Sequence, residues 1–129
     1  EIIYYSFHHW AVRPGDSFTR MLEDYMTRTN IFKRVSTRFW RVEPAYKIET
    51  TIEKIEIVQH TDGYSARLAL ELSLMDNNTN NLILNHEADR TKQLDKKDLN
   101  LFSDAIVTMF YEEAGNFCEK ILKELPAGD

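Results

Sequence analysis

Residues 62–75 read DGYSARLALELSLM, and this stretch decides the fold. Within it, every second residue from Tyr64 onward is apolar, and most of the residues between them are polar or small. Strict alternation of this kind predicts a β-strand with one buried face and one solvated face. Asp62-Gly63 directly precedes the strand and is a strong signal for a two-residue hairpin, because a type I′ turn requires φ > 0 at both central residues.

Long strands are expected on both sides of this one. Residues 46–59 predict the first, with apolar residues on even numbers and then on odd numbers: Tyr46, Ile48, Ile52, Ile55 and Ile57. A change of parity within one strand indicates a β-bulge, which we expect near Glu53-Lys54. A turn is expected over residues 76–81, where asparagines tolerate the left-handed conformation. The apolar residues of the strand that follows are Leu82, Leu84 and Ala88.

An aromatic strand and an amphipathic helix open the chain. Residues 2–10 are rich in aromatic and β-branched residues, which predicts a strand. Pro14-Gly15 ends it, and Asp16 or Ser17 is the expected helix cap, because either side chain can accept from the N–H groups of the first turn. The apolar stripe of this helix consists of Phe18, Met21, Leu22, Tyr25 and Met26. We expect the helix to end near Thr29-Asn30.

A longer amphipathic helix closes the chain. Its apolar stripe consists of Leu99, Phe102, Ile106, Phe110, Ala114, Phe117, Ile121 and Leu125. Asp95 or Asp98 is the expected N-cap. At about 1.5 Å per residue, a helix over residues 99–125 is about 40 Å long. The strand over residues 64–75 has an expected length of about 40 Å as well, so this helix can cover the sheet from end to end.

The expected elements follow the order β-α-β-β-β-β-α, with a short strand over residues 31–37 and a loop over residues 39–44 after the first helix. This order predicts an α+β fold, a two-layer sandwich in which a mostly antiparallel sheet carries two helices packed on one face. With 129 residues and a hydrophobic share of 43%, the chain is expected to form a single domain over residues 1–129.

The composition argues against several classes of protein. The formal net charge is −5, so nucleic acid is not an expected partner, because phosphate binding requires a basic face. Glycine occurs only at positions 15, 63, 115 and 128. Neither a P-loop nor a dinucleotide fingerprint can be assembled from these, which excludes an ATPase or a dehydrogenase. No apolar run approaches the ~20 residues that a membrane helix requires.

No catalytic residue, metal ligand or cofactor is expected from the sequence. His8 and His9 are neighbours in a strand, so their side chains point to opposite faces and cannot bind one ion together. Paired acids such as Glu112-Glu113 diverge by about 100° on a helix and are interpreted as parts of solvated faces. Cys118 is the only cysteine, which excludes an intrachain disulfide. It flanks the apolar stripe and is interpreted as a small buried hydrophobic residue.

Basic residues are concentrated in the first third of the chain. Residues 1–47 contain 8 Lys/Arg and 5 Asp/Glu, whereas residues 48–129 contain 8 and 16. Arginines beside large aromatic residues suit anionic head groups or an acidic protein partner. The candidate lipid- or partner-contact residues are therefore Arg38, Phe39, Trp40 and Arg41. The alternative is that Phe39 or Trp40 folds back into the core and that the arginines are solvated. Candidate scaffold or contact residues on the first strand are Tyr5, Phe7 and Trp10.

Several short pieces of sequence, taken in order, resemble a known family. They are Tyr5 and Trp10 before Pro14, Met21 and Leu22, Phe32 and Val35, Tyr46 and Ile48, Leu70, Leu72 and Leu74 before Asp76-Asn77-Asn78-Thr79, and Ile121 and Leu125. This order is similar to that of the ABC-type transport auxiliary lipoprotein family, of the paraquat-inducible protein C type. Two features depart from it: the lipobox cysteine and the upstream strand-forming sequence are absent, and Asn80 takes a turn position that is often glycine.

The resemblance implies a non-enzymatic accessory lipoprotein of an ABC-type envelope transport system. Such a protein faces the periplasm and is anchored to the outer membrane through an upstream lipid-modified cysteine. It docks on a mammalian-cell-entry-type protein and helps to move lipids or hydrophobic compounds. The implied partners are that protein, the other transporter components and phospholipid, and the sequence is compatible with a homo-oligomer.

Two other functions are compatible with the same residues. The first is a helix-grip domain that binds a small hydrophobic ligand under its last helix; a large apolar pocket between that helix and the sheet would favour it. The second is a small enzyme with a carboxylate in a cleft. A buried carboxylate with a strongly raised pKa would favour that function.

Overall fold

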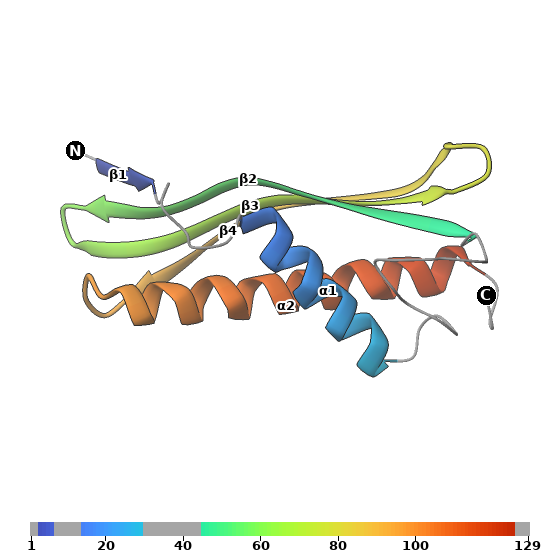
Figure 1. Cartoon of the computed structure of the whole chain (residues 1–129). Helices are drawn as coiled ribbons and strands as arrows, with labels where there is room; N and C mark the ends of the chain where they lie inside the picture. Colours follow the sequence, from blue (N-terminus) through green and yellow to red (C-terminus); the bar gives the residue numbers. More distant parts are fainter. Residues whose placement is uncertain (1–2, 7–13, 30–44, 126–129) are drawn as a thin grey trace.

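The computed structural model describes residues 3–6, 14–29 and 45–125 (Figure 1). The elements in chain order are β1 (Ile3–Ser6), α1 (Pro14–Thr29), β2 (Tyr46–His60), β3 (Gly63–Asp76), β4 (Leu82–Leu94) and α2 (Leu99–Glu124). The predicted α+β class is confirmed. The strand predicted over residues 31–37 and the loop predicted over residues 39–44 lie outside the described residues.

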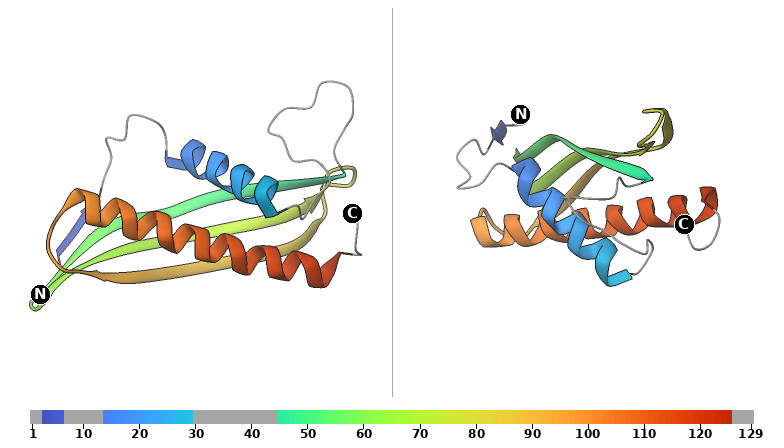
Figure 2. Two further views of the ribbon diagram at one scale, coloured as in Figure 1. Left: turned by 90° about the horizontal axis from the view of Figure 1, so that it is seen from below. Right: turned by 45° about the vertical axis from the view of Figure 1, so that its right-hand side comes forward.

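The sheet is antiparallel throughout its described part, as the sequence predicts. Its four strands lie in the order β1-β2-β3-β4, so each strand pairs with its neighbour in the sequence. The three long strands and α2 run along one another and give the domain an elongated outline (Figures 1 and 2). β3 is the central long strand, paired along its length with β2 on one side and with β4 on the other.

The predicted β-bulge in β2 is confirmed. Ile52 lies opposite Leu70, and Lys54 lies opposite Ala69, so Glu53 is an extra residue without a partner in β3. The extra residue shifts the side-chain alternation by one position. Ile52 before the bulge and Ile55 after it therefore both pack against the core.

The β2–β3 hairpin differs from the predicted type I′ turn at Asp62-Gly63. His60 pairs with Gly63, which leaves Thr61 and Asp62 as the two turn residues. Neither has a positive φ, because Asn80, with φ 60°, is the only such non-glycine residue in the described ranges. Gly63 instead has φ 151° as the first residue of β3. The positive φ predicted for both Asp62 and Gly63 is thus found at Gly63 alone, the residue that tolerates it.

Helix α1 begins earlier than predicted. Its first residue is Pro14, so Asp16 and Ser17 lie inside the first turn and neither is the cap. Proline fits the first turn of a helix, because the N–H group that it lacks has no partner within the helix there. The predicted end is confirmed at Thr29.

Helix α2 is capped by Asp98, one of the two predicted candidates. The Asp98 carboxylate accepts hydrogen bonds from the backbone N–H groups of Asn100, at 2.8 Å, and Leu101, at 3.1 Å. Its backbone is extended, with φ −137° and ψ 129°, as is usual at an N-cap. Asp95 is exposed and lies before the cap.

The core lies between α2 and the face of the sheet that carries the even-numbered residues of β3. Its largest fully buried side chains are Met26, Leu68, Leu70, Leu72, Leu74, Phe102, Ile106, Met109, Phe110, Phe117 and Ile121. Helix α1 contacts β2 and α2. Its Phe18 ring lies 4.8 Å from the ring of Phe110, measured between centroids. A side chain at Gly115 would meet the hydroxyl group of Tyr25 at 3.1 Å, so this glycine allows the close approach of α1.

The aromatic layer of α2 is expected to dominate stability. Phe110 is fully buried, whereas Val107 on the same helix is 39% exposed. Phe110→Ala leaves a cavity and should lower the free energy of unfolding by about 3–5 kcal/mol. Val107→Ala should lower it by less than about 1 kcal/mol. Urea unfolding followed by circular dichroism measures both, and equal losses would contradict the assignment of Phe110 to the core.

The N-cap of α2 gives a second comparison of matched residues. Asp98→Ala removes the acceptor for two N–H groups and should cost about 1 kcal/mol of unfolding free energy. Asp95→Ala should change it by less than about 0.5 kcal/mol, because it is an exposed substitution away from the cap. Urea unfolding followed by circular dichroism measures the loss for both variants. A larger loss at Asp95 would show that the helix begins earlier.

Candidate functional site

The candidate contact residues from the sequence lie mostly outside the described ranges. Arg38, Phe39, Trp40 and Arg41 fall in residues 30–44, and Phe7 and Trp10 fall in residues 7–13. Tyr5 belongs to β1, where its backbone lies opposite Ile57 of β2. The assignment of these residues to a contact surface stays a prediction.

A polar cluster lies between β4 and α2, and we call it the Glu113 cluster: His86, Arg90, Glu112, Glu113 and Asn116. Glu113 occupies the buried face of α2, where it replaces an apolar residue of the stripe, and it is only 6% exposed. His86 and Arg90 lie four residues apart on the same face of β4, and both reach toward α2. The strand and the helix thus supply opposite charges to one place.

The Glu113 carboxylate accepts hydrogen bonds from three side chains. Oε1 lies 2.8 Å from Nε2 of His86 and 3.2 Å from Nδ2 of Asn116. Oε2 accepts from Nη1 of Arg90 at 2.8 Å. The other terminal nitrogen of Arg90 donates to Glu112 at 3.2 Å. Arg90 therefore joins one buried carboxylate to one exposed carboxylate.

The hydrogen bonds of the cluster shift the pKa values of Glu113 and Arg90 in the directions that keep both groups charged. Burial alone raises the pKa of Glu113, but the hydrogen bonds from His86, Arg90 and Asn116 together outweigh burial, and the pKa is lower than the ordinary value. The pKa of Arg90 is raised, chiefly by its hydrogen bond to Glu113. Because an ionised carboxylate can only accept, Nε2 of His86 carries the hydrogen. Nδ1 of His86 is buried and has no partner in the described part of the chain.

The interpretation of Glu112-Glu113 as a solvated pair is wrong for Glu113. Glu112 is exposed, with 55% of its side-chain surface accessible, whereas the Glu113 side chain retains only 7%. Two signals in the sequence point to this difference. Glu113 stands at helical spacing between Met109 and Phe117, and His86 shares the parity of Leu84 on β4.

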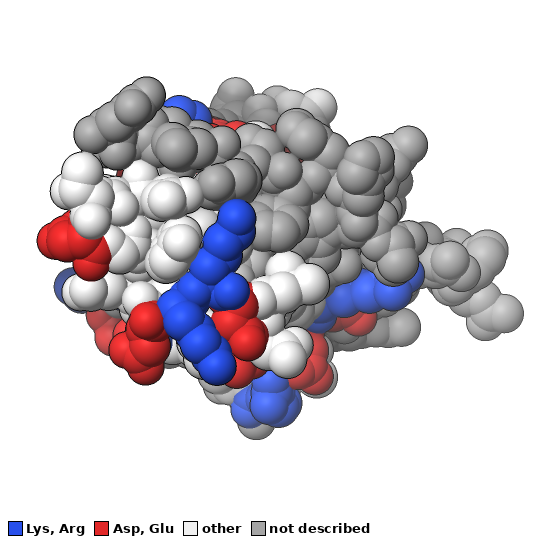
Figure 3. All heavy atoms as spheres, turned by 90° about the vertical axis from the view of Figure 1, so that its left-hand side faces the viewer, with Lys and Arg blue, Asp and Glu red and all other residues white. Residues whose placement is uncertain are grey.

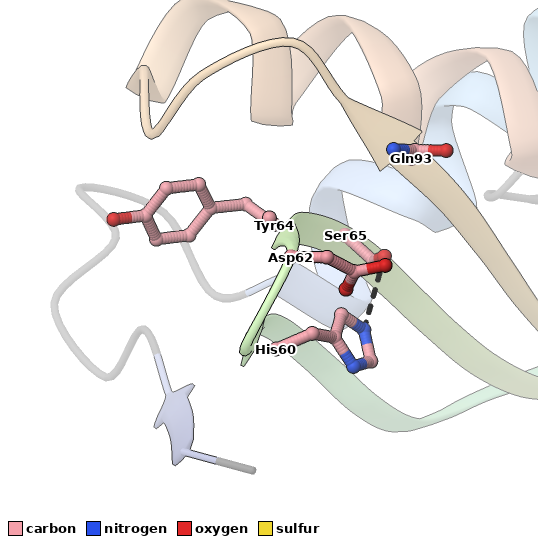
Figure 4. Close-up of a pocket in the computed structure, with 6 residues that line it drawn as sticks. His60, Asp62, Tyr64, Ser65 and Gln93 are labelled. Atoms are coloured by element: carbon pink, nitrogen blue, oxygen red, sulfur yellow. Dashed lines mark hydrogen bonds between the residues drawn. The ribbon is translucent and has the colours of Figure 1, made fainter. Parts of the chain in front are cut away.

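A second polar site lies at the β2–β3 hairpin (Figure 4). It is an open pocket of about 280 Å³, lined by His60, Asp62, Gly63, Tyr64, Ser65 and Gln93. His60, Ser65 and Gln93 come from β2, β3 and β4, so the pocket spans the end of three strands. The hydroxyl group of Ser65 lies 3.2 Å from Nε2 of His60.

The Ser65–His60 pair has the serine–histidine contact of a nucleophilic site but lacks, among the described residues, the acid that orients the histidine. A serine is activated by a histidine within hydrogen-bond reach, which in turn is oriented by an acid at its second nitrogen. Within the described residues, Asp62 forms no hydrogen bond to His60, and the hydrogen bond drawn in Figure 4 joins Ser65 to Nε2 of that ring. We interpret the pair as a cross-strand hydrogen bond.

The charges around this pocket do not favour one kind of ligand. Figure 3 views the end of the molecule where the hairpin lies, and lysine or arginine side chains stand beside acidic ones there. Asp62 is the only lining residue with a formal charge if the histidine is neutral. The described part of this end thus has neither a purely basic nor a purely acidic surface.

The remaining candidate chemistry is limited in the described ranges. Cys118 is 4% exposed, as predicted for a buried hydrophobic residue, and burial raises the pKa of its thiol to about 11. Such a thiol is protonated at neutral pH and is a poor nucleophile. Residues 3–6, 14–29 and 45–125 contain no group of three or more His, Cys, Asp or Glu side chains placed to hold a metal ion. Among the helices described, none has the length and apolar character needed to cross a membrane.

Comparison of the chain with protein-family models, with curated proteins and with solved structures found no significant match. The geometry of the described residues and the pattern of the sequence therefore carry the functional argument.

The Glu113 cluster predicts a specific dependence of stability on pH. The pKa of Glu113 is lower in the folded chain than in the unfolded chain, so its charge stabilises the fold above the unfolded value of about 4.3. This contribution is lost as the pH falls through the lower folded value. Glu113→Gln should cost about 2 kcal/mol of unfolding free energy at pH 7. The difference from the wild type should shrink below about pH 4.

Glu112→Gln is the matched control, because Glu112 contacts the same arginine from an exposed position. It should change the unfolding free energy by less than about 0.5 kcal/mol. Urea unfolding at a series of pH values measures both variants. A Glu113→Gln effect that is constant from neutral to strongly acidic pH would show that the Glu113 charge is not the stabilising group.

Proposed function

We propose that this chain is a non-enzymatic accessory domain that docks on an envelope transport complex of the mammalian-cell-entry type. Its role is to help that complex move lipids or hydrophobic compounds, and its surfaces rather than an internal cleft carry the function. The order of sequence pieces shared with ABC-type transport auxiliary lipoproteins supports this proposal. The order β1-α1-β2-β3-β4-α2 is compatible with that resemblance.

The filled space between α2 and β3 is the observation that carries the proposal. A helix-grip domain needs room for its ligand under the long helix. Here that space holds three phenylalanines of α2 and four leucines of β3, all of them 0–1% exposed: Phe102, Phe110, Phe117, Leu68, Leu70, Leu72 and Leu74. The described pocket lies elsewhere, at the hairpin, and its lining is polar. Docking through surfaces is therefore favoured over ligand enclosure.

Two further observations favour docking over catalysis. The carboxylate buried between β4 and α2 has a lowered pKa, because Glu113 is held by His86 and Arg90. It is ionised and paired at neutral pH, whereas a general acid requires a carboxyl group that keeps its proton. As far as the described residues extend, the imidazole of His60 donates no hydrogen bond to Asp62 that would orient it for the Ser65–His60 pair.

The proposed setting follows from the same resemblance. The domain would face the periplasm, with its parent protein anchored to the outer membrane through a lipid-modified cysteine upstream of this sequence. The proposed partners are a mammalian-cell-entry-type protein, the other transporter components and phospholipid. The proposed contact segment is the basic aromatic one from Arg38 to Arg41, where positive charge can meet an anionic head group or an acidic partner surface.

Charge reversal in this segment tests the docking proposal. Arg38→Glu with Arg41→Glu should weaken binding about tenfold or more, to an immobilised mammalian-cell-entry-type domain of the same source or to phosphatidylglycerol vesicles. Arg20→Glu with Lys120→Glu makes the same change of charge at exposed residues of α1 and α2. This control should bind like the wild type. Unchanged binding of the Arg38/Arg41 variant to both probes would overturn the contact assignment.

The ligand-binding alternative makes a separate prediction. Native mass spectrometry of the chain, purified from cells without detergent, should show the mass of the polypeptide alone, because the space under α2 is filled. A lipid retained at one molecule per chain would instead favour a helix-grip domain. This outcome does not depend on the identity of any protein partner.

A further inference from the structure

β4 is the last strand of the described sheet, and its outer edge has no strand beside it there. It is 13 residues long and, among the strands that the structure describes, pairs with β3 alone. In Figure 2, β4 runs along the outer side of the sheet next to α2. A strand edge of this length presents a row of unpaired N–H and C=O groups, which can pair with the edge of another chain.

The residues of β4 that face α2 differ from those of its neighbour β3. The face of β3 toward the core carries only alanine and leucine from Ala66 to Leu74. The β4 residues opposite these positions include His86 opposite Leu72, Arg90 opposite Leu68 and Lys92 opposite Ala66. Leu84 and Ala88 on this face of β4 pack against the core. The positions of His86, Arg90 and Lys92 carry titratable groups where an edge strand that fully continued the core would carry apolar residues.

The contacts of these groups make strand addition unfavourable. Arg90 keeps 35% of its side-chain surface and reaches both Glu113 and Glu112 of α2. Lys92 is exposed on the same face. A strand added beside β4 would cover these side chains and the adjacent flank of α2. The solvated charges of Arg90, Lys92 and Glu112 would then lose water, which is costly for each charge that does not find a new partner.

Stability alone does not explain the Glu113 cluster. A buried ion pair is often no more stabilising than well-packed apolar residues of similar volume, because desolvation of the charges offsets their attraction. The cost is larger here, since Nδ1 of His86 is buried without a partner in the described chain. An apolar seam between β4 and α2 would be at least as stable as the Glu113 cluster. The charges are therefore better explained by an interaction of β4 with another chain that they prevent.

We propose that the Glu113 cluster protects the edge of β4 that is open in the described sheet, and keeps it from pairing with the β4 edge of a second copy of this chain. The cluster ties the charged side chains of the edge strand to α2 and holds them where an added strand would have to bury them. Docking on a partner then proceeds through other surfaces, so this inference stands or falls independently of the proposed transport function.

The test replaces the cluster by apolar residues of similar size. The variant His86→Val, Arg90→Leu, Glu113→Leu should fold with a thermal midpoint no lower than that of the wild type. It should self-associate at a concentration about tenfold or more below that of the wild type in sedimentation velocity, since the charge penalty is removed. If this variant does not fold, Arg90→Met with Glu113→Gln removes both charges but keeps an acceptor for His86, and the same association is expected.

Cross-linking identifies the surface that associates. Thr91 and Thr51 are exposed threonines on β4 and β2, and Cys118 is buried. In the apolar variant, Thr91→Cys should cross-link between chains with a short bis-maleimide, and Thr51→Cys should not. In the wild-type background neither should cross-link.

Two results would overturn the proposal. One is a folded variant that remains as monodisperse as the wild type, because the cluster would then prevent nothing. The other is equal association of a control in which Thr91→Val and Gln93→Leu add apolar surface to the opposite face of β4, because hydrophobicity alone would then explain it. Cross-linking of Thr91→Cys in the wild-type background would also contradict it.

Discussion

The packing of α2 against β3 is the constraint on which the rest of the structure depends. Four leucines of one strand meet three phenylalanines of one helix, and all seven are at most 1% exposed. These rows of large side chains are buried between a strand and a helix of similar length, so neither element can shift without exposing them. β2, β4 and α1 are then added around this pair, and the bulge after Ile52 lets β2 keep its apolar residues on the same side.

Between β4 and α2, at the edge of this apolar layer, hydrogen bonds and ion pairs replace apolar packing. At β4 the apolar row gives way to charged groups, and Glu113 is the carboxylate that connects them to α2. A lowered Glu113 pKa and a raised Arg90 pKa are the expected result of pairing in a partly dry seam. Within the described residues, an apolar layer between α2 and β3 is thus bordered by a polar, paired seam between α2 and β4.

Local sequence patterns predicted the features that depend on local geometry. Alternation in β3, the parity change in β2 and the cap at Asp98 are consequences of strand and helix periodicity, and all are present. The missed features depend on the fold as a whole. Helical spacing places Glu113 on the apolar face of α2, but its burial also depends on the partners that β4 supplies, which the sequence of α2 does not contain. The position of the hairpin turn depends on the register with β2, which places Thr61 and Asp62 in the turn and leaves the positive φ at Gly63 alone.

The central claim is that the space between α2 and β3 is filled and does not accept a ligand. Methyl NMR measures this most directly, using leucine-labelled protein titrated with lysophosphatidylcholine below its critical micelle concentration. The account predicts that the methyl resonances of Leu68, Leu70, Leu72 and Leu74 do not move, even if surface residues respond. Saturable shifts of these four leucines at one ligand per chain would contradict it and would make the domain a carrier of hydrophobic ligands.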